Sequence, residues 1–188
     1  MNYYISDLHF GDERIMNLCE RPFDNLKIYE KSIIDKWNAK VREEDTVYLL
    51  GDIAANDYFY VIDIIKRLNG KKHLIVGNHD VEMLEFYGMH KVFDSIKYMC
   101  EIKDNGRTVF LCHYPVMDWG DLSKEIYHVY GHIHNKTIKN NLAYNQIKKY
   151  YSNKLGFNCC VDVTKFEPVT LDEMIQLKEK NKNEPYIN

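Results

Sequence analysis

The sequence has no long apolar run, no strong excess of charge of either sign and no C-x-x-C pair. No segment approaches the roughly 20 apolar residues that a membrane helix needs, so we expect no membrane partner. The N-terminus has neither a basic stretch nor a long apolar stretch, so we expect no signal peptide. The 25 basic and 28 acidic residues give a net charge of −3. This balance argues against a dedicated nucleic-acid coat but leaves room for a local basic groove.

The five cysteines are odd in number, and two of them, Cys159 and Cys160, are adjacent. This usage suits reduced thiols better than a disulfide framework, so we expect a cytoplasmic protein. The 188 residues, 45% of them hydrophobic and 28% charged, are typical of one globular domain spanning residues 1–188.

Hydrophobic periodicity predicts alternating strands and helices in the first half of the chain and more antiparallel pairing later. Strands are expected over residues 3–6, 46–50, 73–76, 92–102, 107–112, 126–130 and 159–164. Helices are expected over residues 25–37, 57–68 and 80–88 and at the C-terminus, where Thr170 and Glu173 match a capping box. The pattern indicates an α/β domain with a mixed sheet or two packed sheets. The segment 136–157 has the least regular pattern, and we expect it to be an insertion or a loop near the functional site.

Oxygen and imidazole donors follow five of the predicted strands. They occur in the motifs Asp7-Leu8-His9, Gly51-Asp52, Gly77-Asn78-His79-Asp80, a lone His113, and Gly131-His132-Ile133-His134. In open α/β sheets, ligands bind beyond the carboxyl ends of the strands, so these groups can meet in one crevice. Such a donor set can hold two divalent cations close together, an arrangement suited to attack on phosphorus.

Each motif alone also has a structural explanation. An aspartate after a strand often forms a turn, a lone His113 is more often packed than a ligand, and Asp80 can cap the next helix. The pair His132 and His134 is more specific, because alternate residues of an extended segment share one face. It is the ordered combination that coincidence does not explain.

In this order the motifs read D-x-H, G-D, G-N-H-D, H and G-H-x-H, a pattern that resembles the calcineurin-like metallophosphoesterase superfamily over residues 1–134. Phe10-Gly11 and Arg21-Pro22-Phe23 are similar to the small stand-alone bacterial and phage-type members. Asp12 departs from that pattern, so no substrate role is carried over to its loop. The resemblance implies an α/β fold of two packed mixed β-sheets flanked by helices, a four-layer sandwich.

The resemblance also implies two divalent metal ions, with Asp52 bridging them. One ion would be held by Asp7, His9, Asp52 and His134, and the other by Asp52, Asn78, His113 and His132. Manganese is the metal we expect, with iron, nickel, zinc or magnesium as alternatives, because the set contains imidazoles, carboxylates and an amide but no thiolate.

The implied chemistry is in-line attack by a metal-bridging hydroxide on a phosphoester. His79 would act as general acid toward the leaving group, and Asp80 would orient its ring. Arg14 or Arg21 either contacts a substrate phosphate or serves a structural role.

The leading hypothesis is therefore a phosphodiesterase. A phosphomonoesterase acting on a small substrate is the first alternative, and a catalytically weak metal-binding scaffold is the second. A nucleotide or a nucleic-acid end is one substrate class, because lysines and tyrosines mix between residues 136 and 154. The same residues would equally suit a solvated loop.

Overall fold

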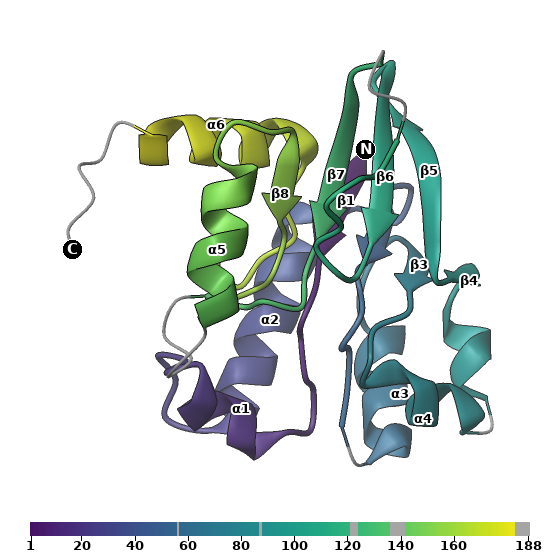
Figure 1. Cartoon of the computed structure of the whole chain (residues 1–188). Helices are drawn as coiled ribbons and strands as arrows, with labels where there is room; N and C mark the ends of the chain where they lie inside the picture. Colours follow the sequence, from purple (N-terminus) through teal and green to yellow (C-terminus); the bar gives the residue numbers. More distant parts are fainter. Residues whose placement is uncertain (56, 87, 121–123, 136–141, 183–188) are drawn as a thin grey trace.

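The structure is a computed structural model that describes residues 1–188 except 56, 87, 121–123, 136–141 and 183–188 (Figure 1). The strands are β1 (Asn2–Ile5), β2 (Thr46–Leu49), β3 (Lys71–Ile75), β4 (Ser95–Lys97), β5 (Met99–Asp104), β6 (Arg107–Cys112), β7 (Ile126–Tyr130) and β8 (Gly156–Asn158). The helices are α1 (Glu13–Leu18), α2 (Leu26–Lys40), α3 (Tyr58–Lys66), α4 (Asp80–Glu85), the 3₁₀ helix η1 (Met89–Val92), α5 (Leu142–Tyr151) and α6 (Leu171–Lys182).

The strands form two four-stranded sheets. The first has the order β1-β2-β3-β4 with parallel pairing throughout, and an isolated antiparallel bridge joins Tyr4 of β1 to Val169. The second has the order β5-β6-β7-β8 and is mixed, because β5 pairs with β6 in antiparallel fashion whereas β6, β7 and β8 are parallel. The two sheets and flanking helices confirm the expected α/β fold.

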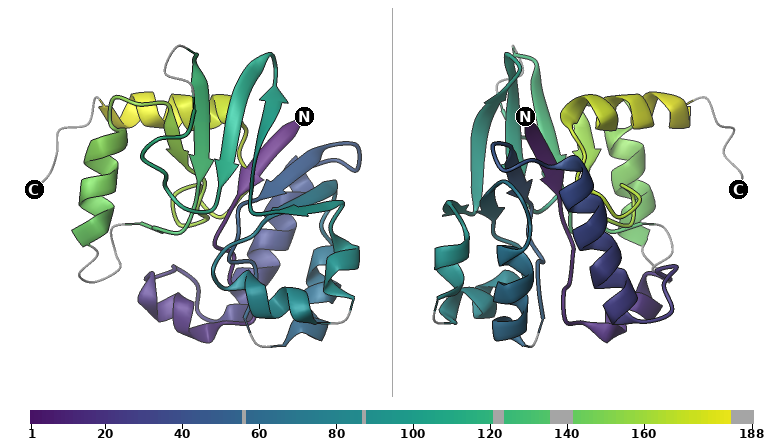
Figure 2. Two further views of the ribbon diagram at one scale, coloured as in Figure 1. Left: turned by 45° about the vertical axis from the view of Figure 1, so that its right-hand side comes forward. Right: turned by 180° about the vertical axis from the view of Figure 1, so that it is seen from behind.

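Side chains of β1 alternate between two hydrophobic cores. Tyr3 and Ile5 belong to a core that also contains Ile33 and Trp37 of α2. Tyr4 points the other way, into a core shared with Val109 and other residues of the second sheet. This period-two alternation places the first sheet between helices and the second sheet. Figure 2 shows the same layering, with α5 and α6 beside β8 at one edge.

Local signals explain the helix boundaries that the sequence predicts well. The Asn25 side chain accepts a hydrogen bond from Ile28 N and begins α2, and Asp57 does the same for α3 through Tyr60 N. The expected capping box is present, since Glu173 Oε2 accepts from Thr170 N at 2.7 Å and Thr170 Oγ1 accepts from Glu173 N at 3.2 Å.

Two expected strands are wrong in extent. The predicted strand 92–102 is divided into β4, in the first sheet, and β5, in the second, because the chain changes sheets at Tyr98. The predicted strand 159–164 is replaced by β8, which ends at Asn158, and by turns in which Lys165 and Phe166 have positive φ. Apolar residues therefore do not mark one continuous strand in either segment: Tyr98 and Met99 are exposed where the chain changes sheets, whereas Cys159, Cys160 and Val161 are buried outside the named strands.

The segment 136–157, expected to be an insertion or loop, contains α5 and most of β8, and residues 136–141 lie outside the described residues. Within the described ranges, none of the helices is both long enough and apolar enough to cross a bilayer.

Candidate metal centre

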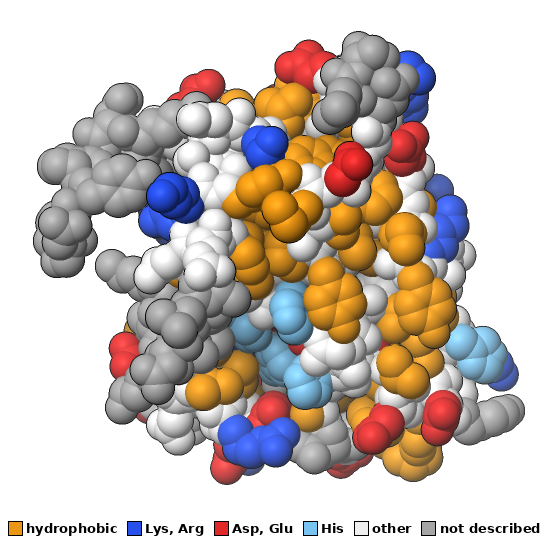
Figure 3. All heavy atoms as spheres, in the orientation of Figure 1, with side chains coloured by type: hydrophobic (Ala, Val, Ile, Leu, Met, Phe, Trp, Pro, Cys, Tyr) orange, Lys and Arg blue, Asp and Glu red, His pale blue; other side chains and the backbone are white. Residues whose placement is uncertain are grey.

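The motif residues gather where their strands end. Asp7 follows β1, Asp52 follows β2, Asn78 follows β3, His113 follows β6 and His132 follows β7. The donor atoms of Asp7, His9 and His134 lie within 4.8 Å of one another, and those of Asp52, His113 and His132 do the same. Histidine side chains gather near the centre of the face shown in Figure 3, below a band of hydrophobic side chains. The structure thus brings together the residues that the sequence singled out.

The first of these groups, with Asp7, His9 and His134, is called the buried half below. Its side chains are 0%, 4% and 6% exposed, respectively. His113 and His132 of the second group, together with the neighbouring Asn78, are called the open half. Asn78 is exposed and His132 is partly exposed, although His113 is buried.

Asp52 lies between the two halves. Its Oδ2 is 3.5 Å from His113 Nε2 in the open half and 3.9 Å from His9 Nε2 in the buried half. Its Oδ1 accepts a hydrogen bond from His79 N at 3.0 Å. A carboxylate in this position is suited to serve two cations at once.

The backbone of the centre is strained. Positive φ angles between 50° and 69° occur at Asp7, His9, Asp52, His132 and His134. Such values are uncommon for residues with a Cβ and cost of order 1–3 kcal/mol each, and they concentrate at functional sites. In these left-handed conformations, the donor atoms of neighbouring short loops lie close together.

Glycines before the ligands allow the loops to approach closely. A Cβ on Gly51 would lie 2.5 Å from His113 Nδ1, and one on Gly131 would lie 2.5 Å from Asp7 Oδ2. A Cβ on Gly77 would collide with Asp52 Oδ1. The glycines of the G-D, G-N and G-H motifs are therefore required by space.

Carboxylates dominate the electrostatics. Burial alone would raise the pKa of Asp52, but the hydrogen bond to His113 and the charge of that ring hold it below its usual range. Burial would lower the pKa of His113, yet Asp52 and the charge of Asp7 raise it to about 9. Burial likewise opposes protonation of His134, but Asp162 raises its pKa to about 10. Carboxylates that favour the cationic form of these imidazoles also favour the binding of metal cations.

The donor set fits a divalent metal. His9 Nε2 is buried and has no hydrogen-bond partner among the described residues. Burial lowers the pKa of His9 to about 4, so the ring is neutral and keeps a lone pair for coordination. An unpaired buried nitrogen beside carboxylates costs stability unless it binds a cation, which makes His9 the clearest sign of a metal ligand.

Asp80 has different partners from those expected. Its carboxylate accepts hydrogen bonds from the backbone N–H groups of Asp52 at 2.9 Å, Ile53 at 2.9 Å and Gly77 at 2.7 Å. These bonds tie the Asp52 loop to the Gly77 loop. These bonds give Asp80 a role in fixing the Asp52 loop, and the expected orientation of the His79 ring by Asp80 stays a prediction.

Sequence reasoning missed Asp162, which no spacing motif marks. Its Oδ2 accepts a hydrogen bond from His134 Nδ1 at 2.9 Å, and its Oδ1 accepts one from Arg21 Nε at 2.8 Å. Arg21 is buried, so of the two roles proposed for it the structural one is observed. The Arg21-Pro22-Phe23 motif was the one available signal for this interaction.

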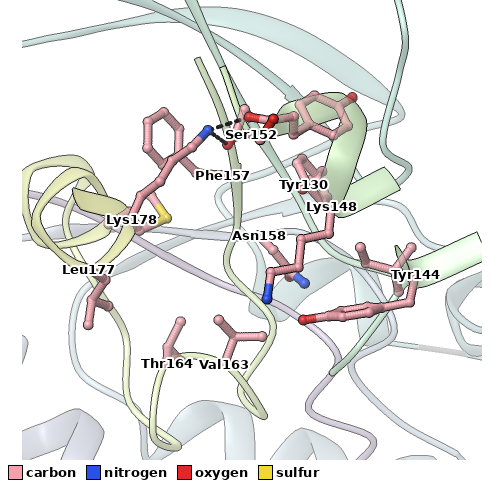
Figure 4. A pocket seen from close by; sticks show the side chains of 14 residues that line it. Tyr130, Tyr144, Lys148, Ser152, Phe157, Asn158, Val163, Thr164, Leu177 and Lys178 are labelled. Carbon is pink, nitrogen blue, oxygen red and sulfur yellow. Dashed lines mark hydrogen bonds between the residues drawn. The ribbon is translucent and has the colours of Figure 1, made fainter. Parts of the chain in front are cut away.

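A cavity of about 210 Å³ lies on the other side of the His132–His134 loop, between α5, β8 and α6 (Figure 4). Ile133 and Asn158 line it, and Asn158 Nδ2 donates a hydrogen bond to His134 O at 2.9 Å. Lys178 donates to Tyr151 O and Gly156 O, which closes the end of α5 against β8. The surface that lines the cavity is mainly apolar. The lining residues therefore pack behind the His132–His134 loop and are not arranged as donors to the metal centre.

Comparison with known proteins agrees with this geometry. Residues 3–149 match the calcineurin-like phosphoesterase superfamily domain. The uncharacterized protein MJ1445 of Methanocaldococcus jannaschii is 32% identical over 188 residues, covering 99% of this chain and 96% of that protein. The gene 66 protein of Mycobacterium phage L5 is 27% identical over 165 residues, covering 72% of this chain and 78% of that protein.

A solved structure of similar fold is that of AQ665, a protein of unknown function from Aquifex aeolicus. It superposes with a TM-score of 0.70 and 28% identity, over 94% of this chain and 98% of that one. The domain match extends over most of the chain and includes every motif of the metal centre. The chain therefore belongs to the calcineurin-like phosphoesterase superfamily, which makes hydrolysis of phosphate esters its supported class of activity.

Proposed function

We propose that the chain is a dinuclear-metal phosphoesterase that prefers phosphodiesters. The observation that carries this proposal is the place of Asp52 Oδ2, which is 3.5 Å from His113 Nε2 and 3.9 Å from His9 Nε2. One carboxylate oxygen that faces imidazoles of both halves is suited to bridge two ions.

Each half would hold one ion together with Asp52. The proposed ligands are Asp7, His9, Asp52 and His134 for one ion, and Asp52, Asn78, His113 and His132 for the other. Imidazole, carboxylate and amide donors support manganese as the native metal, with iron, nickel, zinc and magnesium as alternatives. When bound, the two ions would lower the pKa of a water nucleophile and neutralise charge on the phosphoryl oxygens.

His79 is the proposed general acid. It is exposed at the mouth of the site, its ring centroid lies 5.4 Å from that of His9, and its backbone N–H is fixed on Asp52 Oδ1. A side chain that is anchored beside the ligands but is not one of them can reach the leaving oxygen of a bound ester.

Three contacts support a diester over a monoester. Arg14 is paired with Asp12 at 2.8 Å, and Arg21 is paired with Asp162 at 2.8 Å, so neither arginine near the Asp7–His9 loop is directed at the second negative charge of a monoester. Tyr114 is 44% exposed and its ring lies 4.7 Å from that of His132. An aromatic surface there suits a substituted leaving group, such as a nucleotide or a nucleic-acid end.

The test is hydrolysis of bis-p-nitrophenyl phosphate and p-nitrophenyl phosphate by protein stripped of metal and then supplied with Mn²⁺, Ni²⁺, Zn²⁺ or Mg²⁺. Asp52→Asn removes the bridging charge at constant shape. Asp35→Asn is the matched control, since Asp35 is an exposed carboxylate on α2 that pairs only with Lys31 among the ion pairs of the described residues.

We expect metal-dependent cleavage of the diester, a loss of more than about 100-fold in Asp52→Asn, and no change in Asp35→Asn. Faster cleavage of the monoester would replace the diesterase by a phosphomonoesterase. A folded protein that cleaves neither compound with any metal would contradict the enzyme proposal.

A cytoplasmic location is part of the same proposal. None of the five cysteines, all within the described residues, is in a disulfide, and four of them are buried. Buried thiols outside disulfides suit a reducing compartment.

A further inference from the structure

We propose that Asp162 is a positioning residue of the metal centre, which fixes the His134 imidazole with Nε2 toward the metal while the buried Arg21 holds Asp162 in place. The inference rests on the proposed function in one respect only, the binding of a metal by His134. It adds Asp162, which none of the motifs contains, and it assigns a role to Arg21 of the Arg21-Pro22-Phe23 motif.

The three side chains form one chain of contacts. His134 Nδ1 donates to Asp162 Oδ2 at 2.9 Å. Arg21 then donates to both oxygens of Asp162, from Nε to Oδ1 at 2.8 Å and from Nη2 to Oδ2 at 3.1 Å. The Arg21 and Asp162 side chains are 0% and 1% exposed, so this fork is shielded from water and geometrically fixed.

This contact selects the tautomer of His134. A neutral imidazole carries a single N–H, and the carboxylate beside Nδ1 requires that the proton sit there. A metal that binds His134 would therefore displace the proton of Nε2, because Nδ1–H stays bonded to Asp162; Nε2 lies 3.5 Å from Asp7 Oδ1 in the buried half. A metal-binding histidine is usually oriented in this way by a carboxylate on its other nitrogen.

Arg21 also holds the segment that carries the other ligands of the buried half. Its guanidinium donates to Asp7 O at 2.8 Å and to Leu8 O at 3.1 Å. Asp7 and His9 both have positive φ, so this loop needs external contacts to keep its conformation. One cation therefore ties the strained loop to the carboxylate that orients the third ligand, and its charge offsets that of Asp162.

Two thiols offer a competing interpretation. Cys19 Sγ lies 3.3 Å and Cys160 Sγ lies 3.7 Å from the same His134 Nδ1. Together with Asp162 they could bind a thiophilic metal, which would make Nδ1 a ligand. The Cys160 thiol donates to Asp162 Oδ2 at 3.2 Å. Cys160 is thus a further donor to the carboxylate, which favours the positioning role.

The experiment measures the two Zn²⁺ affinities of the full chain by calorimetry, for the wild type and Asp162→Asn. Asparagine keeps the shape, but its amide can turn to donate to Nδ1 and so place the imidazole proton on Nε2, the wrong nitrogen for binding. Asp172→Asn is the matched control, because Asp172 pairs with an arginine, Arg107, on the surface at 2.6 Å.

We expect Asp162→Asn to weaken one of the two Zn²⁺ affinities by about 10- to 100-fold and to leave the other affinity unchanged, as in the control. Wild-type affinity at both sites in a folded Asp162→Asn variant would overturn the proposal. A wild-type protein that binds no Zn²⁺ would also overturn the proposal, and it would contradict the proposed function as well. Failure of phosphoester hydrolysis with the affinity effect intact would end only the proposed function.

A second measurement needs no variant. Long-range ¹H–¹⁵N spectra of the Zn²⁺-loaded protein, labelled at histidine nitrogen, report which nitrogen of His134 carries the proton. We expect a protonated Nδ1 and a metal-shifted Nε2. A metal-shifted Nδ1 would overturn the positioning role and assign the thiols as ligands.

Discussion

The two halves of the metal centre have similar donors but different surroundings. In the buried half, Asp7, His9 and His134 are almost inaccessible, and Arg21 and Asp162 support them from behind. In the open half, Asn78 is exposed and His132 is partly exposed, with Tyr114 at 4.7 Å from the His132 ring. Under the proposed function, the buried half would hold an ion, whereas the open half would hold an ion and admit a substrate. We therefore expect mutations in the buried half to lower the metal content, and mutations on the open side of the site to lower turnover.

The largest effect is expected for His9→Ala, in the buried half. It removes a ligand and leaves a cavity beside two carboxylates, so we expect metal content to fall by one ion per chain and diester hydrolysis to fall by more than about 100-fold. Elemental analysis of the dialysed variant measures the metal content, and cleavage of bis-p-nitrophenyl phosphate measures the hydrolysis. His90→Ala, at an exposed position on η1, is the control. Two ions retained in His9→Ala would remove the distinction between the halves.

His79→Ala tests the open side of the site. Because His79 is not a proposed ligand, the variant should keep both ions and the wild-type melting temperature. Turnover should fall by about 10²- to 10⁴-fold for a diester with an alkyl leaving group, and much less for p-nitrophenolate, which needs no proton. Equal slowing of the two substrates would argue against a general acid at this position.

A buried histidine outside the centre sharpens the comparison. His128 of β7 is as inaccessible as the ligands, but both its nitrogens have partners, Phe110 O and Val116 N, each at 3.2 Å. Burial lowers the pKa of His128 to about 4, below the unfolded value of 6.5. As the pH falls, the unfolded chain therefore binds a proton at His128 before the folded chain does. The contribution of His128 to the free energy of unfolding is fully present above pH 6.5 and is lost as the pH falls toward 4. Linkage gives a loss of roughly 3 kcal/mol.

Urea unfolding of metal-free protein between pH 7 and pH 4 measures this loss. His128→Gln keeps an acceptor for Val116 N and does not titrate, so its free energy of unfolding should fall less over this range. An identical pH dependence in the variant would show that His128 is not the group responsible.

The smallest expected effect concerns metal removal. Ions that bind only the folded state stabilise it by about 2.7 kcal/mol at a concentration 100 times the dissociation constant. A chelator should therefore lower the melting temperature of the wild type and of His79→Ala equally, and that of His9→Ala by less. A chelator without effect on the wild type would contradict a metal that holds the buried half together.

The sequence predicted much of the first sheet and its helices. β1 and β2 are short, mainly apolar strands and β3 ends in apolar residues, each followed by a polar loop, and α2 and α3 have capping residues and helical spacing. It failed where apolar residues occur on both sides of a change of chain direction. Residues 92–102 cross from one sheet to the other, and the turns after Asn158 are buried without being a strand.

The motif ligands could be found because glycines and donors recur at fixed spacing, and the structure brings them together. Their metal roles stay predictions. Asp162 could not be found, since its function depends on a contact with His134, 28 residues away, and with Arg21, 141 residues away. Nor could the positive φ of the ligands be predicted, because Asp and His do not signal a left-handed conformation as glycine does.

The most direct test of the dinuclear centre is anomalous diffraction from crystals soaked with Mn²⁺. The account predicts two manganese peaks, one in contact with Asp7, His9 and His134, the other with Asn78, His113 and His132, and the Asp52 carboxylate between them. A single peak, or two peaks that Asp52 does not join, would contradict it.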